Sequence, residues 1–174
     1  VFPPRRVQVM QRYGALVLLV IAIPFVWLRS HDVEPLRFFV TPADEEALTW
    51  LADYTDHSGE VAINTTFWLP TSPHGIDAGY WIPYFTEQQT NTGVMISSLG
   101  GVQLVKRILA DSALVKQAVL EPQALDDLYE RGYRYLYIGA LSGYDESGFN
   151  ADTFARYERA AKIYDRNGVT IFML

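Results

Sequence analysis

The stretch YLYIGA, residues 135–140, decides the fold, because its apolar and aromatic residues predict a strand buried at the centre of a sheet. A second short apolar run, Val61–Asn64, predicts a neighbouring central strand that pairs with it in parallel. Near the C-terminus, Lys162–Tyr164 and Val169–Met173 flank DRNG, and Asn-Gly in such a position is a strong signal for a tight hairpin. The hairpin is therefore expected to add an antiparallel edge to this sheet.

Helices are expected before, between and after these strands. Thr41 can cap a helix that starts at Pro42, carries acidic residues in its first turn and stops near His57–Gly59. This alternation predicts an α/β fold: a small mixed sheet with helices on its faces and a C-terminal antiparallel hairpin, preceded by one transmembrane helix. The remaining predicted elements are a short strand at Val94–Ser97, a helix that starts after Gly100-Gly101, and helices at Gln123–Arg131 and Asn150–Arg159.

The transmembrane helix is predicted from YGALVLLVIAIPFVWL, residues 13–28, which contain no charge. This stretch is shorter than the roughly 20 apolar residues of a straight span, but preceding residues extend it if Arg12 snorkels to the headgroups. Tyr13 and Trp27 lie near its two ends, where aromatic belts form. A signal peptide fits less well because no small-residue cleavage site follows, and a buried core helix would show a polar face.

Charge is divided unevenly between the predicted helix and the rest of the chain. Residues 1–29 contain four arginines and no acidic residue, while the remainder has the other ten of the 14 basic residues and all 20 acidic residues, a net charge of −10. By the positive-inside rule, residues 1–30 form a cytoplasmic stub and the transmembrane helix, and residues 31–174 form an extracytoplasmic domain at the cell membrane. Such an acidic domain repels polyphosphate, so nucleic acid is excluded as a partner.

A long aromatic segment, residues 65–92, lies between the predicted strands and contains three prolines that forbid one continuous helix. Within it, SPHGIDAGYWIPYFT, residues 72–86, combines aromatic rings with a carboxylate. Carbohydrate sites favour this mixture, because aromatic faces stack on sugar rings and carboxylates accept hydrogen bonds from hydroxyl groups. The alternatives are aromatic packing beneath the loop, contact of the rings with lipid headgroups, and a local cap for the carboxylate. The residues predicted to bind a ligand are His74, Asp77, Tyr80, Trp81 and Tyr84.

Other groups of residues give weaker indications of a functional site. Asp53, Asp56 and His57 are expected to form the solvated end of a helix rather than a metal site. Residues 145–148 lack the alternating oxygen ligands of a calcium loop, and residues 97–101 lack the Lys of a phosphate-binding loop. The chain has no cysteine to supply a thiolate, and no catalytic, cofactor-binding or metal-binding residue is predicted in it.

Two stretches resemble the soluble tails of bacterial polytopic membrane glycosyltransferases of the C-type superfamily: GIDAGYWIPYFTEQQTNTG at residues 75–93, and the ending with GYRYLYIGA and AKIYDRNGVTIFML. These enzymes are relatives of the dolichyl-phosphate-mannose mannosyltransferases and of ArnT. DEEALTWL, residues 44–51, is similar to the helix that follows the last membrane span in those proteins. The opening VFPPRR reads as a loop entered from upstream, so the chain is expected to be one piece of such a polytopic protein.

The resemblance implies a supporting role for these residues. In that family the sugar donor is linked to polyprenyl phosphate, and the catalytic acid and metal contacts lie in loops between early membrane helices, outside this chain. The implied function is an accessory domain that caps the membrane-embedded active site or helps to bind the acceptor. Its implied partners are membrane lipid, the upstream transmembrane part, and a carbohydrate or lipid-linked sugar, with no cofactor in this fragment. The alternatives are a non-enzymatic binding or assembly module, and an anchored hydrolase. The sequence shows no converging nucleophile and base for a hydrolase, which an Asp77–His74 pair beside a deep pocket would support.

Overall fold

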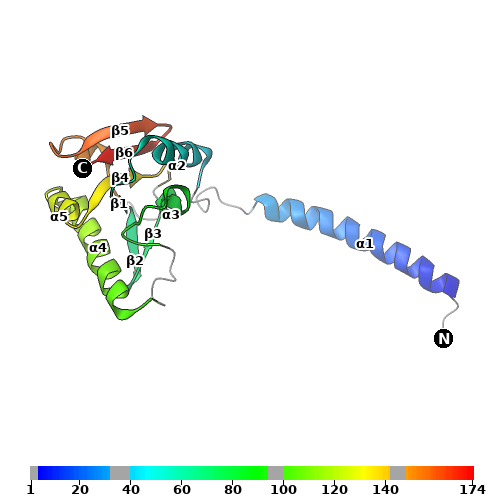
Figure 1. Cartoon of the computed structure of the whole chain (residues 1–174). Helices are drawn as coiled ribbons and strands as arrows, with labels where there is room; N and C mark the ends of the chain where they lie inside the picture. Colours follow the sequence, from blue (N-terminus) through cyan, green and yellow to red (C-terminus); the bar gives the residue numbers. More distant parts are fainter. Residues whose placement is uncertain (1–3, 32–39, 94–99, 142–147) are drawn as a thin grey trace. The chain divides into compact units, whose positions relative to one another are not determined.

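The computed structural model describes residues 4–31, 40–93, 100–141 and 148–174. These residues form two units, helix α1 and the domain of residues 40–174 (Figure 1). The helices are α1 (Pro4–His31), α2 (Pro42–Tyr54), the 3-10 helix η2 (Ala78–Trp81), α3 (Ile82–Thr86), α4 (Val102–Leu120), α5 (Ala124–Glu130) and α6 (Ala151–Phe154). The strands are β1 (Glu60–Ile63), β2 (Thr65–Leu69), β3 (Ser72–Gly75), β4 (Tyr133–Ile138), β5 (Ala161–Arg166) and β6 (Val169–Met173).

Four strands of the domain form one mixed sheet in the order β1-β4-β6-β5. β1 and β4 run parallel, with Val61 opposite Tyr135, whereas β6 is antiparallel to both β4 and β5. The parallel pairing of β1 with β4 and the C-terminal hairpin are therefore confirmed. The prediction that the strand at Val61–Asn64 is central was wrong, because β1 lies at the edge of the sheet. The hairpin turns at Asn167 and Gly168, whose φ angles of 51° and 85° lie in the left-handed region that Asn and Gly tolerate best. The additional strand predicted at Val94–Ser97 lies outside the described residues.

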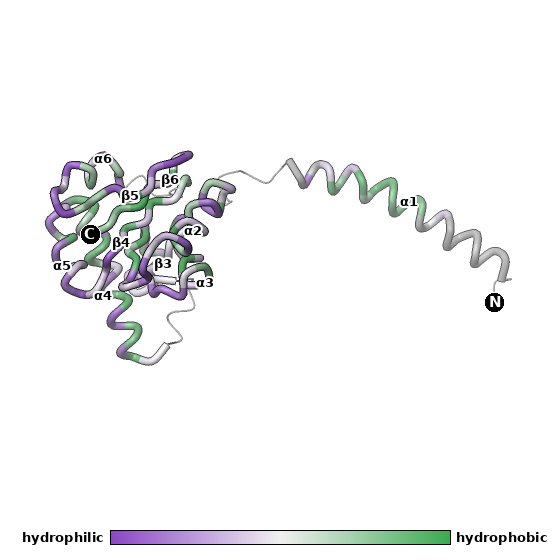
Figure 2. The backbone as a smooth tube through the Cα atoms, turned by 45° about the horizontal axis from the view of Figure 1, so that its top comes forward, coloured by the Kyte–Doolittle hydropathy of each residue, from purple (hydrophilic) through white to green (hydrophobic). Residues whose placement is uncertain are grey.

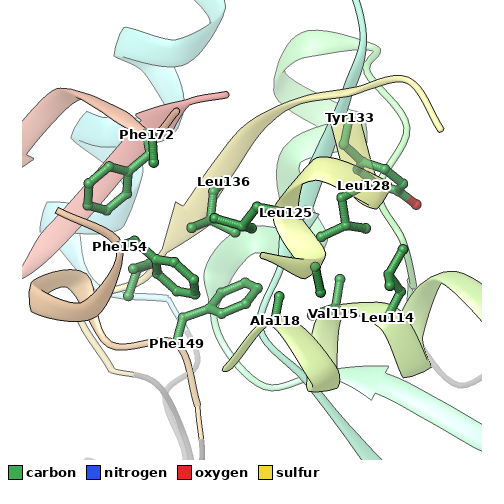
Figure 3. Close-up of a cluster of buried hydrophobic side chains, with 14 residues drawn as sticks. Leu114, Val115, Ala118, Leu125, Leu128, Tyr133, Leu136, Phe149, Phe154 and Phe172 are labelled. Atoms are coloured by element: carbon green, nitrogen blue, oxygen red, sulfur yellow. The ribbon is translucent and has the colours of Figure 1, made fainter. Parts of the chain in front are cut away.

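Helices cover both faces of this sheet, which gives the mixed α/β architecture that the sequence predicted. Residues of β4 alternate between two cores, because successive side chains of a strand point to opposite faces. Figure 3 shows the core that β4 shares with α4, α5 and α6, which includes Leu125, Leu136, Phe149, Phe154 and Phe172. The opposite core joins β4 to α2 and η2 through Leu48, Leu51, Ala78, Tyr135 and Tyr137.

The aromatic segment of residues 65–92 is folded into regular pieces. β2 and β3 form a separate two-stranded antiparallel sheet, and η2 and α3 follow it directly. The segment then runs along the outer edge of β1, where Val61 N–H donates to the carbonyl of Gln89 (2.9 Å) and Ile63 N–H donates to Asn91 Oδ1 (2.7 Å). It thereby covers a sheet edge that would otherwise present unpaired backbone groups.

One helix near the C-terminus is much shorter than the sequence predicted. The prediction was a helix over Asn150–Arg159, but α6 ends at Phe154. That prediction was wrong because side chains beyond this point bind α5. Tyr157 Oη donates to the carboxylate of Asp126 (2.8 Å), and Arg159 pairs with the same carboxylate (2.7 Å). These tertiary contacts hold the backbone in turns and override its helical preference.

Helix α1 covers the stretch for which the sequence predicted a helix, and Figure 2 shows hydrophobic residues along it. Its described apolar side chains are exposed. The prediction was a membrane-spanning helix within residues 1–30. Across the described part of the chain, no helix combines the length and the apolar character needed to cross a membrane. The helix is therefore confirmed and the span is not. The uncharged stretch, residues 13–28, is shorter than the roughly 20 residues of a straight span.

Candidate functional site

The five predicted ligand-binding residues lie on consecutive elements, and β3 and α3 are neighbours in both views of the chain (Figures 1 and 2). Local sequence explains why these elements form. An aspartate caps the start of η2, and a proline in the first turn of α3 has the backbone angle that a helix needs. The five residues are His74 on β3, Asp77 at the cap of η2, Tyr80 and Trp81 on η2, and Tyr84 on α3.

Asp77 is fully buried, so its carboxylate does not reach the surface of the domain. Its Oδ1 accepts a hydrogen bond from Gly79 N–H (2.9 Å), and its Oδ2 accepts one from Gly139 N–H (3.1 Å). Burial raises the pKa of Asp77 to about 7, and the hydrogen bonds from these two backbone groups only partly oppose the effect. Asp77 therefore ties the start of η2 to the loop that follows β4, which is the local capping role weighed in the sequence.

A second buried carboxylate, Asp44 at the start of α2, binds the same loop. Its Oδ1 accepts hydrogen bonds from Ala140 N–H (3.0 Å) and from Tyr137 Oη (2.8 Å). Gly139 lies between the two carboxylates, where a Cβ atom would be 2.8 Å from Asp77 Cβ and 3.1 Å from Asp44 Oδ1. We call Asp44 and Asp77 the carboxylate latch, because together they hold α2 and η2 on the C-terminal end of β4.

A row of aromatic side chains on β2, β3, η2 and α3 lies at the surface, and we call it the aromatic ridge. Neighbouring rings are in contact, with centroids 5.5 to 6.1 Å apart. The ring contacts form two groups, one on the β2–β3 hairpin and one on η2 and α3. The backbone at Gly75, next to His74, lies close to Tyr80, because a Cβ atom at Gly75 would be 3.3 Å from Tyr80 Cβ. Trp68 is 68% exposed, Trp81 is 42% exposed and Tyr84 is 78% exposed. The ridge consists of Trp68, His74, Tyr80, Trp81, Tyr84 and Phe85.

His74 packs against Trp68 and does not pair with Asp77. Its imidazole Nδ1 is buried without a hydrogen-bond partner among the described residues. The hydrolase interpretation needs this pair beside a deep pocket, and the arrangement gives it no support.

A cavity of about 410 Å³ lies on a different part of the domain, next to α5 and the turns after α6, and is lined by Asp126, Tyr157, Glu158 and Arg159. Two loops with weaker signals fall largely outside the described residues, at positions 97–99 and 145–147.

The acidic end of α2, where a metal site was weighed in the sequence, makes a local turn. The carboxylate of Asp56 accepts hydrogen bonds from Ser58 N–H (3.0 Å), Ser58 Oγ (2.6 Å) and Tyr135 Oη (2.8 Å). These bonds lower the pKa of Asp56 to about 2. The His57 ring is bonded to the carbonyl of Ala52 (2.8 Å). Within the described ranges, no cluster of three His, Cys, Asp or Glu residues is arranged to hold a metal ion.

The sequence interpretation did not single out Trp68 or Asp44 as parts of this region. Trp68 and Leu69 are exposed at the end of β2, and an apolar pair directly before a proline turn was the available signal. The acidic first turn of α2 predicted only a favourable effect on the helix dipole for Asp44. Its Oδ2 accepts hydrogen bonds from Thr41 N–H (2.8 Å) and Thr41 Oγ1 (2.7 Å) in a local capping box. The partners of its Oδ1, Tyr137 and Ala140, are 93 and 96 positions away, a separation at which local spacing carries no information.

Comparison of the chain with protein-family models, with characterised proteins and with solved structures found no match.

Proposed function

We propose that residues 31–174 form the accessory extracytoplasmic domain of a membrane-embedded glycosyltransferase that uses a polyprenyl-phosphate-linked sugar donor. The domain caps the membrane-embedded active site or helps to bind the acceptor, and the catalytic residues lie outside this chain. The aromatic ridge is the observation that carries the proposal. Exposed Trp and Tyr side chains suit both sugar rings and the lipid part of such substrates, because each has an apolar face and a polar tip.

The attachment to a membrane is supported by α1. Its described apolar side chains between Leu16 and Trp27 are exposed, and an apolar surface of this kind is stable only when lipid or protein covers it. Three arginines precede the apolar stretch, and the acidic residues all follow it, a distribution of charge that suits an acidic domain outside the cytoplasm. Part of the ridge lies within residues 75–93, one of the two stretches that resemble the soluble tails of the membrane glycosyltransferases.

The carboxylate latch gives the ridge a fixed base. Asp77 caps η2, which carries Tyr80 and Trp81, and its second oxygen binds Gly139 at the end of the central strand. Groups held by packing and by second contacts of this kind keep a defined geometry without a ligand. The ridge is therefore suited to present a constant surface to a substrate or to the membrane-embedded part.

The experiment is glycosyl transfer by the full-length protein with Trp81→Ala or Tyr84→Ala. Each substitution is expected to lower transfer at subsaturating acceptor by about tenfold, the equivalent of losing a contact worth about 1.4 kcal/mol. Tyr54→Ala is the matched control, because Tyr54 is 73% exposed and stacks on Trp50 with centroids 5.7 Å apart, but lies on α2 outside the ridge. The control is expected to keep the wild-type rate.

A non-enzymatic binding or assembly module is the second candidate. The burial of Asp77 favours this second candidate. Asp77 was the group predicted to accept hydrogen bonds from sugar hydroxyl groups, and its carboxylate is not available at the surface. Transfer that stays at the wild-type rate in folded Trp81→Ala and Tyr84→Ala proteins would support the module and contradict the accessory role in transfer.

A further inference from the structure

We propose that the aromatic ridge rests on the headgroup region of a zwitterionic phospholipid bilayer. This inference names the direct partner of the ridge, and it rests on the membrane attachment proposed above. The ridge would then fix the face that the domain turns towards the membrane.

The first argument is the scarcity of charged residues in the chain segment that forms the ridge. Between Val61 and Val105, the only Asp, Glu, Lys or Arg residues are Asp77 and Glu87. Asp77 is buried and adds no charge to the surface, so Glu87, exposed directly after α3, is the single surface charge of this segment among the described residues. A surface that recognises a charged partner carries complementary charges, whereas this one exposes aromatic rings in a domain that is otherwise rich in charge. A net-neutral lipid surface fits such a face, and an anionic one is repelled by the net charge of −10 after residue 29.

The second argument is the type and arrangement of the rings. Trp and Tyr are the residues that favour the boundary between lipid tails and water. Successive rings from Tyr80 to Phe85 are tilted by 36°, 83° and 80°, so they do not share one flat platform on which a rigid sugar chain would stack. A fluid boundary adapts to rings of different tilt. Trp68 and Leu69, exposed at the end of the β2–β3 hairpin, add apolar surface of the same kind.

The third argument is the length of the connection between α1 and the domain. Residues 32–39 separate the end of α1 from the first described residue of the domain. Eight residues span at most about 30 Å even when fully extended. Under the membrane attachment proposed above, a domain joined to α1 by so few residues has a high effective concentration at the lipid surface, so a patch of a few rings is enough to hold it there.

The test uses the full chain in phosphatidylcholine vesicles that contain nitroxide-labelled phosphatidylcholine. Because the chain has no cysteine, one introduced cysteine takes one polarity-sensitive fluorophore. The three positions are Tyr84→Cys on the ridge, Leu19→Cys on α1, and Leu120→Cys at the end of α4, where the native side chain is 82% exposed. The expected result is blue-shifted emission and lipid quenching at positions 84 and 19, and water-like emission without quenching at position 120.

The outcomes test the contact of the ridge with lipid separately from the attachment of α1 to the membrane. Quenching at position 19 with none at position 84 overturns the inference about the ridge and leaves the membrane attachment intact. No quenching at position 19 contradicts the attachment, and the inference falls with it. Because the contact has no ionic component, quenching at position 84 that disappears in high salt also overturns the inference. In the Tyr84→Cys chain, adding Trp68→Ala is expected to reduce the quenching while near-ultraviolet circular dichroism stays native-like.

Discussion

The buried carboxylate of Asp77 makes the stability of the domain depend on pH in a direction opposite to that of a paired aspartate. Its pKa is near 3.8 in the unfolded chain, and burial raises it to about 7 in the folded domain. Below both pKa values the carboxyl group is protonated in the folded and in the unfolded state, and its burial does not lower the free energy of unfolding through titration. Between them the unfolded chain releases a proton that the folded domain retains, so the free energy of unfolding falls as the pH rises. Above about pH 7 the penalty is complete and constant.

The size of the effect follows from the difference between 3.8 and about 7. At about 1.4 kcal/mol for each factor of ten in proton affinity, the folded state loses about 4 kcal/mol across this window. Asp77→Asn removes the titrating group. Its amide oxygen can still accept from Gly79 N–H, but its amide nitrogen faces Gly139 N–H, so the variant loses one buried hydrogen bond. That loss costs about 1–3 kcal/mol at every pH.

The assay is urea unfolding of the full chain in detergent micelles between about pH 4 and about pH 8, the window in which the linkage acts. The unfolding free energy of Asp77→Asn relative to the wild type is expected to rise by about 4 kcal/mol across this range. Asp53→Asn, a substitution at an exposed position on α2, is the control and should show no such rise. If the difference in unfolding free energy between Asp77→Asn and the wild type stays constant with pH, the inference that burial raises the pKa of Asp77 is refuted.

Three other substitutions, the first with a matched control, test the packing. Gly139→Ala places a Cβ atom 2.8 Å from Asp77 Cβ and is expected to lower the urea unfolding free energy by about 1–3 kcal/mol, whereas Gly93→Ala, which meets nothing within 4 Å, should change it by less than about 0.5 kcal/mol. Phe154→Ala empties a fully buried ring position and should cost about 3–5 kcal/mol in the same assay. Asn91→Ala leaves Ile63 N–H without its partner, and faster hydrogen exchange at that amide is the expected readout. Equal effects at Gly139 and Gly93, or unchanged exchange at Ile63, would contradict these assignments.

The main sheet was predictable because its signals are local. The apolar run that became β4 and the Asn-Gly turn between β5 and β6 are contained in short stretches of sequence, and no distant contact is needed to interpret them. The segment that covers the edge of β1 was not predictable. It depends on the side chain of Asn91 meeting the backbone of Ile63, 28 positions away, and sequence spacing does not encode that meeting.

The candidate site shows the same division. That His74, Tyr80, Trp81 and Tyr84 share one region followed from their closeness in the chain. The orientation of Asp77 did not, because it is set by Gly139, 62 positions away, where only a residue without a side chain leaves room for the carboxylate. The shortened α6 has a similar cause, since contacts with α5 decide where that helix ends.

One labelling experiment decides whether the domain lies outside the cytoplasm, as the accessory role requires. Leu120→Cys places a thiol at an exposed position at the end of α4 in a chain without cysteine of its own. In intact cells that express the full-length protein, with any cysteines elsewhere in it replaced, a membrane-impermeant maleimide is expected to label position 120 before lysis. Labelling that appears only after the cells are broken would place the domain in the cytoplasm and contradict the proposed function.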